Sequence, residues 1–178
     1  MEYQEILDFW FKEIDPKFHF KKDEHFDEEI RQRFSEVHRQ AAAGELWQWR
    51  ETIQGRLAEI IILDQFSRNM FRDQAKAFST DGIALVLAQE AIRTEEIDKL
   101  TTSQRSFLYM PFMHSESMAI HDIAMELFAE KGMENTLQFE IGHRDIIVKF
   151  GRFPHRNKAL NRDSTPEEVE YMKENKGF

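Results

Sequence analysis

IQGRLAEIIILDQFSRNMFR, residues 53–72, is the stretch of sequence that decides the fold. Its apolar residues recur at the i, i+4 and i+7 positions of one helix face, and further aliphatic residues fill the flanks of the same turns. A helix that is apolar on every side must be surrounded by other elements. We therefore predict a buried central helix here.

The end of this stretch carries polar side chains on the same buried helix: Asp64, Gln65, Arg68 and Asn69. An acid, a base and two amides would then lie where water is scarce. Each of them needs an internal partner or a ligand, because an unpaired buried polar group is costly. The end of the central helix is the first candidate functional position.

Composition favours long helices with few turns. Among 178 residues there are 16 Phe and 8 Met, but only 7 Gly and 4 Pro. No alternating β pattern flanked by hairpin turns occurs. We predict an all-α fold, a single domain over residues 1–178 with about seven or eight antiparallel helices around the central one.

Several classes of function lack support in the sequence. The chain has no Cys, which excludes disulfides, thiolate metal sites and Cys nucleophiles. It also lacks a P-loop, a G-x-G-x-x-G and a G-x-S-x-G motif. The amino terminus has no apolar signal core, and no apolar run approaches the roughly 18 residues of a membrane span. We expect a cytoplasmic protein with no cofactor and no membrane partner.

The charge of the chain is unevenly distributed. A net charge of -9 argues against a nucleic-acid partner, because phosphate neutralisation supplies most of that affinity. Residues 143–162, however, hold six Lys or Arg against one Asp, a local +5, which leaves -14 for the rest. This asymmetry predicts either a local anion site or a basic segment that lies against the acidic remainder of the molecule.

Helix start and stop signals divide the rest of the chain. The strongest start signal is Thr165-Pro166, with Glu168 three residues after the cap. Helices are expected over residues 2–14, from Asp23 to about 43, after Ser79 or Thr80, from Thr102 or Ser103 to an interruption at Pro111, from about 115 to 131, from Asn135 or Thr136 to 150, and from Thr165 to about 175.

Three polar residues fall on apolar helix stripes: Asp64, Glu116 and His143. Two carboxylates in different environments can divide into an acid and a base, and a histidine can transfer protons between them. Nearby Arg side chains would hold an anionic substrate. The alternatives are a divalent cation held by oxygen and imidazole, and a salt-bridge network that only joins helices.

The F-P-H-R-N loop, residues 153–157, concentrates donors after the helix that ends near Phe150. Such a loop either binds an anion or satisfies the last carbonyls of that helix. His114 and His121 are seven residues apart, whereas a zinc pair on a helix is usually at i, i+4. We predict no metal site.

The blocks ILDQFSRNMFR, FLYMPFMHSES and HRDIIVKFGRFPHRN, followed by RDSTPEE, resemble a known family. It is catalogued as domain of unknown function 924, bacterial and plant proteins whose fold is similar to the tetratricopeptide-like helical class. The resemblance runs from about Phe9 to the end and implies that fold, but no established reaction. Ser67 stands where the family usually has Pro, and Asn161 where it usually has Gly, both in expected turns.

The resemblance also implies that the polar candidates occupy the family's signature positions. We assign catalytic roles to Asp64, Glu116 and His143. Substrate binding is assigned to Arg68, Asn69, Tyr109, His114, Arg152, His155, Arg156 and Asn157.

Two functional hypotheses follow from the sequence. The first is a helical protein that binds a small anionic metabolite at an inward-facing site, with acid–base catalysis left open. The alternative is a tetratricopeptide-like scaffold that binds a protein or peptide without catalysis. In a third interpretation the polar cluster only sets the register of the helices. The sequence makes no prediction about the oligomeric state.

Overall fold

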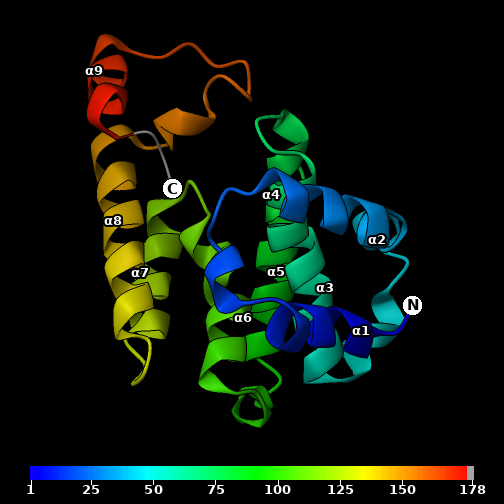
Figure 1. Cartoon of the computed structure of the whole chain (residues 1–178). Coiled ribbons are helices and arrows are strands. Elements are labelled where there is room, and N and C mark those ends of the chain that lie inside the picture. The colour runs from blue at the N-terminus through cyan, green and yellow to red at the C-terminus, as the bar shows by residue number, and fades with distance from the viewer. Residues whose placement is uncertain (176–178) are drawn as a thin grey trace. The chain divides into compact units, whose positions relative to one another are not determined.

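The computed structural model describes residues 1–175, which are helical and contain no strand (Figure 1). The predicted all-α class is confirmed. The chain forms two compact units: unit 1 contains Met1–Arg72 and Lys76–Pro111, and unit 2 contains Asp73–Ala75 and the chain from Phe112 onward. The single domain and the tetratricopeptide-like arrangement stay predictions.

Unit 1 contains the first six α-helices, two of which continue through a π-helical turn. Its elements are α1 (Tyr3–Asp8) with the π turn η1 (Phe9–Glu13), α2 (Glu24–Ala42), α3 (Ile53–Ile61) with the π turn η4 (Ile62–Phe66), α4 (Ser67–Met70), α5 (Asp81–Ile92) and most of α6 (Thr102–Met113). Because α3, η4 and α4 follow one another without a break, the nine α-helical segments of residues 1–175 make eight helices.

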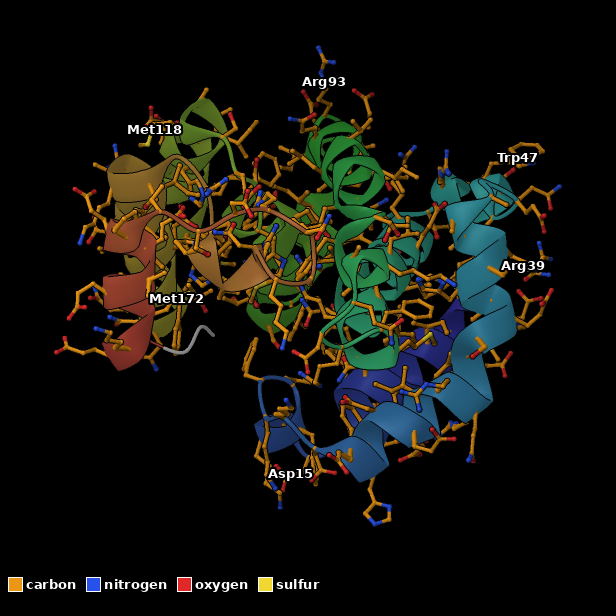
Figure 2. The ribbon with its side chains drawn as sticks, turned by 90° about the horizontal axis from the view of Figure 1, so that it is seen from above. Asp15, Arg39, Trp47, Arg93, Met118 and Met172 are labelled. Atoms are coloured by element: carbon orange, nitrogen blue, oxygen red, sulfur yellow. The ribbon has the colours of Figure 1, made fainter. Side chains whose placement is uncertain are left out.

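The central helix of unit 1 is buried as predicted. All residues from Leu57 to Ser67 are buried, and α3 packs against α1 and α5 while η4 packs against α2. Charged residues instead cover the outside of this unit, where Arg39 and Arg93 extend away from the ribbon (Figure 2). The apolar stripe therefore decides which helix lies in the middle.

One carboxylate inside this helix was missed by the sequence analysis. Glu59 is fully buried and accepts two hydrogen bonds of 2.7 Å from the guanidinium of Arg50, which lies on the short 3-10 helix η3 (Trp47–Glu51). A bidentate pair of this kind compensates for the loss of water around the carboxylate. Arg50 thus fixes η3 against α3.

Unit 2 is built on the helix pair α7 (Met118–Phe128) and α8 (Glu134–Phe150), which lie side by side in Figure 1. The short 3-10 helix η7 (Pro154–Arg156) and α9 (Pro166–Glu174) follow. Gly151 ends α8 in the left-handed conformation with φ 71°, and Thr165 starts α9 with a capping box to Glu168. Both end signals were predicted.

Three predicted boundaries are wrong. Helix α6 continues through Pro111 to Met113, because a proline in the last turn removes only one helical hydrogen bond. Helix α7 begins at Met118 and ends at Phe128, three residues before the predicted end. Helix α8 begins after Met133, and neither Asn135 nor Thr136 caps it. Tertiary packing overrides the capping preferences at these positions.

Gly55 allows α3 to approach η3, so its substitution tests this packing. A Cβ at Gly55 would lie 2.0 Å from the backbone oxygen of Trp49, which cannot move away alone. We expect Gly55→Ala to lower the free energy of unfolding by roughly 1–3 kcal/mol, despite the better helix propensity of alanine. Denaturant unfolding of the purified chain measures this change.

Gly142→Ala is the matched control, because a Cβ at Gly142 in α8 would meet nothing within 4 Å. There the gain in helix propensity should raise the free energy of unfolding by about 0.5–1 kcal/mol. Equal effects of the two substitutions would contradict the tight contact between α3 and η3.

Candidate functional site

The two units divide the predicted site residues between them. Unit 1 contains Asp64, Arg68, Asn69 and Tyr109, whereas unit 2 contains His114, Glu116, His143, Arg152, His155, Arg156 and Asn157. That all of them form one shared site stays a prediction. Within each unit the contacts show which of them come together.

Asp64 and Arg68 lie at the π turn of the central helix and contact each other. Arg68 Nη1 is 3.2 Å from Asp64 Oδ1, and the guanidinium donates to both oxygens of Asp81 at 2.8 and 2.9 Å. Burial disfavours the charged guanidinium, but the carboxylates of Asp64 and Asp81 outweigh it and raise the pKa of Arg68. The sequence analysis missed Asp81, which binds Arg68 to the start of α5.

Asn69 belongs to a different set of contacts. Its amide donates to Asp27 Oδ1 at 2.8 Å, and Arg72 donates to the same carboxylate at 2.6 and 2.7 Å. Asp27 is 5% exposed, so this charge is compensated inside unit 1. These bonds hold α2 against α4. Tyr109 is also buried, in α6.

A buried Ser–His contact, which the sequence did not indicate, lies beside the π turn. His38 Nε2 is 2.7 Å from Ser67 Oγ, which itself donates to the carbonyl oxygen of Leu63 at 2.7 Å. The serine hydroxyl also lies 3.0 Å from Thr80 Oγ1. Burial and Lys76 lower the pKa of His38 to about 4. A histidine with this pKa is a poor base for activating a serine nucleophile.

Two carboxylates of unit 2 fix the loop that contains the F-P-H-R-N sequence. Glu168 accepts bonds of 2.7 and 2.8 Å from Arg152 and one of 3.2 Å from Asn157. Arg152, opposed by burial, lowers the pKa of Glu168 to about 2. Arg152 and Asn157, predicted to bind substrate, thus attach the loop to α9.

Glu116 holds the other end of this loop. Its carboxylate accepts bonds of 2.7 and 2.9 Å from Arg162 and one of 2.7 Å from the backbone N–H of Phe153. Burial alone would raise the pKa of Glu116, but these donors and the charge of Arg156 lower it. A carboxylate that stays ionised in this way positions the loop more readily than it transfers protons.

Half of the basic segment is matched by carboxylates of its own unit. Arg144 pairs with Asp122 of α7 at 2.9 Å. Together with Arg152 and Arg162, three of its six Lys and Arg lie against acidic residues of unit 2. These three fit the second interpretation of the charge asymmetry, and an anion site stays a prediction.

Three predicted residues lie against the buried ring of Phe153, and a fourth, His114, contacts two of these three. The rings of His143 and His155 lie 5.7 and 5.6 Å from it, and the Arg156 guanidinium lies 4.6 Å from its centre. Arg156 also donates to the carbonyl oxygen of His114 at 2.9 Å, and the His114 ring lies 6.3 Å from that of His143. We call these five residues the Phe153 cluster.

The protonation of His143 follows from its contacts. Its Nδ1 is 2.7 Å from the carbonyl oxygen of Phe139, which can only accept, so Nδ1 carries the proton. Burial, together with His114, His121 and His155, lowers the pKa of His143 to about 3. The ring is neutral at pH 7, and Nε2 is its basic nitrogen.

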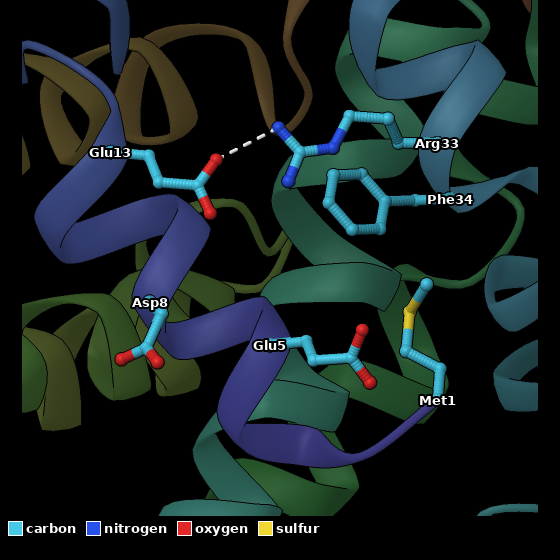
Figure 3. Close-up of a pocket in the computed structure, with 6 residues that line it drawn as sticks. All are labelled: Met1, Glu5, Asp8, Glu13, Arg33 and Phe34. Carbon is cyan, nitrogen blue, oxygen red and sulfur yellow. Dashed lines mark hydrogen bonds and ion pairs between the residues drawn. The ribbon is translucent and has the colours of Figure 1, made fainter.

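A pocket of about 350 Å³ lies elsewhere, in unit 1 (Figure 3). Arg33 and Phe34 face three carboxylates across it, and Arg33 pairs with Glu13 at 2.9 Å. None of the predicted site residues lines it; the lining consists of Met1, Glu5, Asp8, Glu13, Arg33 and Phe34. Its acidic rim is unsuited to an anion.

Two further searches of residues 1–175 gave negative results. They hold no group of three or more His, Asp or Glu side chains placed to bind a metal ion. None of their helices has the length and apolar character that crossing a membrane requires.

Comparison with known proteins now gives the family. The family model described as "Bacterial protein of unknown function (DUF924)" matches residues 6–176. The chain belongs to this family. The resemblance recognised in the sequence is thereby confirmed.

A solved structure agrees with the DUF924 assignment. The protein of unknown function ATU0120 from Agrobacterium tumefaciens is similar to this chain, with 41% sequence identity and a TM-score of 0.92 over 97% of each chain. No curated protein matches the chain. The fold is therefore shared with a solved relative, and the function has to be argued from the site.

The two departures from the DUF924 pattern have different structural consequences. Asn161 lies in a turn and has φ 52°, a left-handed conformation that asparagine tolerates better than other residues with a side chain. Ser67, expected in a turn, instead begins α4. Its hydroxyl donates to the carbonyl oxygen four residues earlier, a contact that proline could not make.

The Glu168 contacts make the stability of this DUF924 protein sensitive to acid. The folded pKa of Glu168 lies below its ordinary value of 4.5, so its contribution is present above pH 4.5 and is lost as the pH falls through about 2. We expect Glu168→Gln to lower the free energy of unfolding at pH 7 by roughly 1–3 kcal/mol, and the deficit to shrink below pH 4.5. Denaturant unfolding between pH 7 and 3 measures it.

Glu167→Gln, at the exposed neighbouring position, is the control for the change in charge. It should leave the pH dependence of unfolding unchanged. A deficit in Glu168→Gln that stays constant with pH would argue against the ion pair with Arg152.

Proposed function

We propose that the protein binds a small anionic molecule, one that carries a carboxylate or phosphate, at the Phe153 cluster. The observation that carries this proposal is the convergence of Arg156 and the imidazoles of His143 and His155 on one buried aromatic ring, with His114 beside them. Arg156 is 6% exposed and lies over the ring face, while His114 and His155 are half-buried. Cations and imidazole donors around a shielded ring suit an anion.

The side chains of the cluster supply different parts of anion recognition. A guanidinium offers a planar fork that matches two oxygens of a carboxylate or phosphate. Electrostatic attraction is stronger near an apolar ring than in bulk water, because the local dielectric is lower. The loop that carries His155 and Arg156 is held at both ends, by Glu116 and by Glu168. Such pre-organisation lowers the entropic cost of binding.

His143 supplies the acid–base part of the proposal. Its pKa of about 3 makes it a weak base when no anion is bound. A negative charge placed beside the ring favours the imidazolium and raises the pKa. His143 then becomes a competent proton acceptor only when the substrate is present. Glu116 acts as a positioning residue, and the catalytic role of Asp64 in unit 1 stays a prediction.

A scaffold that binds a peptide without catalysis is the second candidate. It is favoured by Phe20, which is 69% exposed and stacks on Phe107 of unit 1 at 6.0 Å. Phe107 itself is buried, so Phe20 is an exposed aromatic side chain on a firm base, which is suited to anchor a partner. Peptide binding abolished by Phe20→Ala, and indifferent to Arg156, would favour this function over the first.

The main test is a thermal-shift screen with inorganic phosphate, succinate and phosphorylated metabolites. A ligand at about 100 times its dissociation constant stabilises the fold by about 2.7 kcal/mol, a shift of several degrees. We expect Arg156→Gln to abolish the shift. His155→Gln, in the half-buried part of the loop, should weaken binding and provides a milder variant if Arg156→Gln is unstable.

Arg93→Gln is the control, because Arg93 is exposed on unit 1 and pairs only along its own helix with Glu90. It should retain the full shift. The proposal is wrong if Arg156→Gln and Arg93→Gln respond to the ligand alike.

The acid–base part predicts that the bound anion changes the titration of His143. In ring-nitrogen NMR spectra, the pKa of His143 should rise from about 3 when the stabilising anion is added. Exposed His25, in unit 1, is an internal reference, and its ring signals should not respond to the anion. An anion that binds without moving the His143 titration would leave binding intact and remove the catalytic role.

A further inference from the structure

His121 and Glu140 form a fully buried pair in unit 2 that the proposed function does not use. Each is 0% exposed, and His121 Nδ1 lies 2.6 Å from Glu140 Oε1. The other ring nitrogen, Nε2, lies 2.8 Å from the carbonyl oxygen of Ser115. The pair thus connects α8 through α7 to the turn that precedes α7.

These two distances fix the number of protons on the pair. A carbonyl oxygen only accepts, so Nε2 of His121 carries a proton. A second proton must lie between Nδ1 and Oε1, because two lone pairs would otherwise face each other at 2.6 Å. It belongs either to an imidazolium beside a carboxylate or to a carboxylic acid beside a neutral ring. In both descriptions the pair has no net charge.

Burial explains why the shared proton is retained. The surroundings are the ring of Phe153 from the loop, the charge of Arg144 on α8, and His143, which responds to His121. Burial raises the pKa of Glu140, although His121 and Arg144 act in the opposite direction. Oε2 of Glu140 has no hydrogen-bond partner among residues 1–175, so a full negative charge there would be uncompensated by them.

The turn that this pair holds contains His114, one of the residues of the Phe153 cluster. Three consecutive residues are held from two segments, the F-P-H-R-N loop and α7: His114 by Arg156, Ser115 by His121, and Glu116 by the N–H of Phe153. Loss of the Ser115–His121 contact would loosen the residues on both sides of Ser115. These are His114, whose carbonyl oxygen binds Arg156, and Glu116, whose carboxylate binds the N–H of Phe153.

We infer that His121 and Glu140 are positioning residues, and that the single proton they share locks the turn 114–116 in the geometry that the anion site requires. The part about the anion site rests on the proposed function. The proton count and the lock rest on the contacts alone.

The shared proton has a thermodynamic signature. In an unfolded chain, above the ordinary histidine pKa of about 6.5, a separate His and Glu hold one proton between them. The folded pair holds two. The folded state then loses stability as the pH rises, by a tenfold change in the unfolding equilibrium constant per pH unit, until the pair itself deprotonates.

Glu140→Gln removes the shared proton but keeps a hydrogen bond to Nδ1 of His121. The glutamine amide can donate to Nδ1 while Nε2 keeps its proton, so the contact to Ser115 remains without the titration. We expect the tenfold change per pH unit above pH 7 in the wild-type chain, up to the pH at which the pair deprotonates, and its absence in Glu140→Gln. Asp145→Asn, which removes a carboxylate at an exposed position of the same helix, should retain the wild-type slope.

Glu140→Ala tests the positioning role, because it removes the partner of Nδ1. The amide of Phe153, bonded to Glu116, reports on the turn, and its hydrogen exchange should be at least tenfold faster in Glu140→Ala than in Asp145→Asn. Binding of the anion found in the screen should weaken by a similar factor. If Glu140→Ala does not fold, the same two measurements on Glu140→Gln, made above the pH at which the wild-type slope levels off, should show protection retained where the wild type loses it.

The outcomes separate this inference from the proposed function. Equal pH slopes in the wild type and Glu140→Gln would overturn the shared proton, and unchanged exchange at Phe153 in Glu140→Ala would overturn the lock. The absence of any anion that stabilises the wild type would reject the proposed function while leaving the slope and the exchange as measured.

Discussion

A charge buried in a helical fold must be matched inside that fold, and this constraint decides where most of the polar side chains of the protein lie. An ion without water costs several kcal/mol unless another group replaces the hydration. Glu59 meets this condition through Arg50, Asp27 through Arg72, and Glu140 through its contact with His121. In each case the partner comes from another element. Matching therefore also fixes how neighbouring elements are attached to one another.

The helices could be predicted from the sequence because their signals are local. The apolar period of residues 53–66, the glycine at 151 and the capping box at Thr165 each lie within a few residues of the feature they specify. Partner choice has no such signal. Glu116 finds Arg162 at a separation of 46 residues, and nothing in the spacing selects it among the 24 Lys and Arg of the chain.

The sequence indicated which polar residues of the candidate site are buried, but it did not indicate the role of each one. Polar residues on apolar stripes indicated correctly that Asp64 and His143 are buried, since periodicity reports which face is covered. Whether a polar residue stabilises the fold or is available for the proposed ligand depends on where each guanidinium points. The π turn at residues 62–66 was also not predictable. Its hydrogen bonds join residues i and i+5, and a sequence pattern analysed at 3.6 residues per turn does not show them. In this turn the carbonyl oxygen of Leu63 accepts hydrogen bonds from two hydroxyls, those of Ser67 and Thr80.

Phe153 explains how one loop can combine structural and functional demands. Its backbone N–H and carbonyl are bonded to Glu116 and Arg162, which leaves the ring as the contact surface for Arg156 and the imidazoles. An aromatic ring supplies negative potential at its face and excludes water without neutralising a cation by a full charge. Arg156 therefore keeps its charge at the ring face, while burial and the neighbouring imidazoles oppose protonation of His143 on the same ring. In the proposed function a bound anion would favour the imidazolium, and binding and basicity would then be coupled.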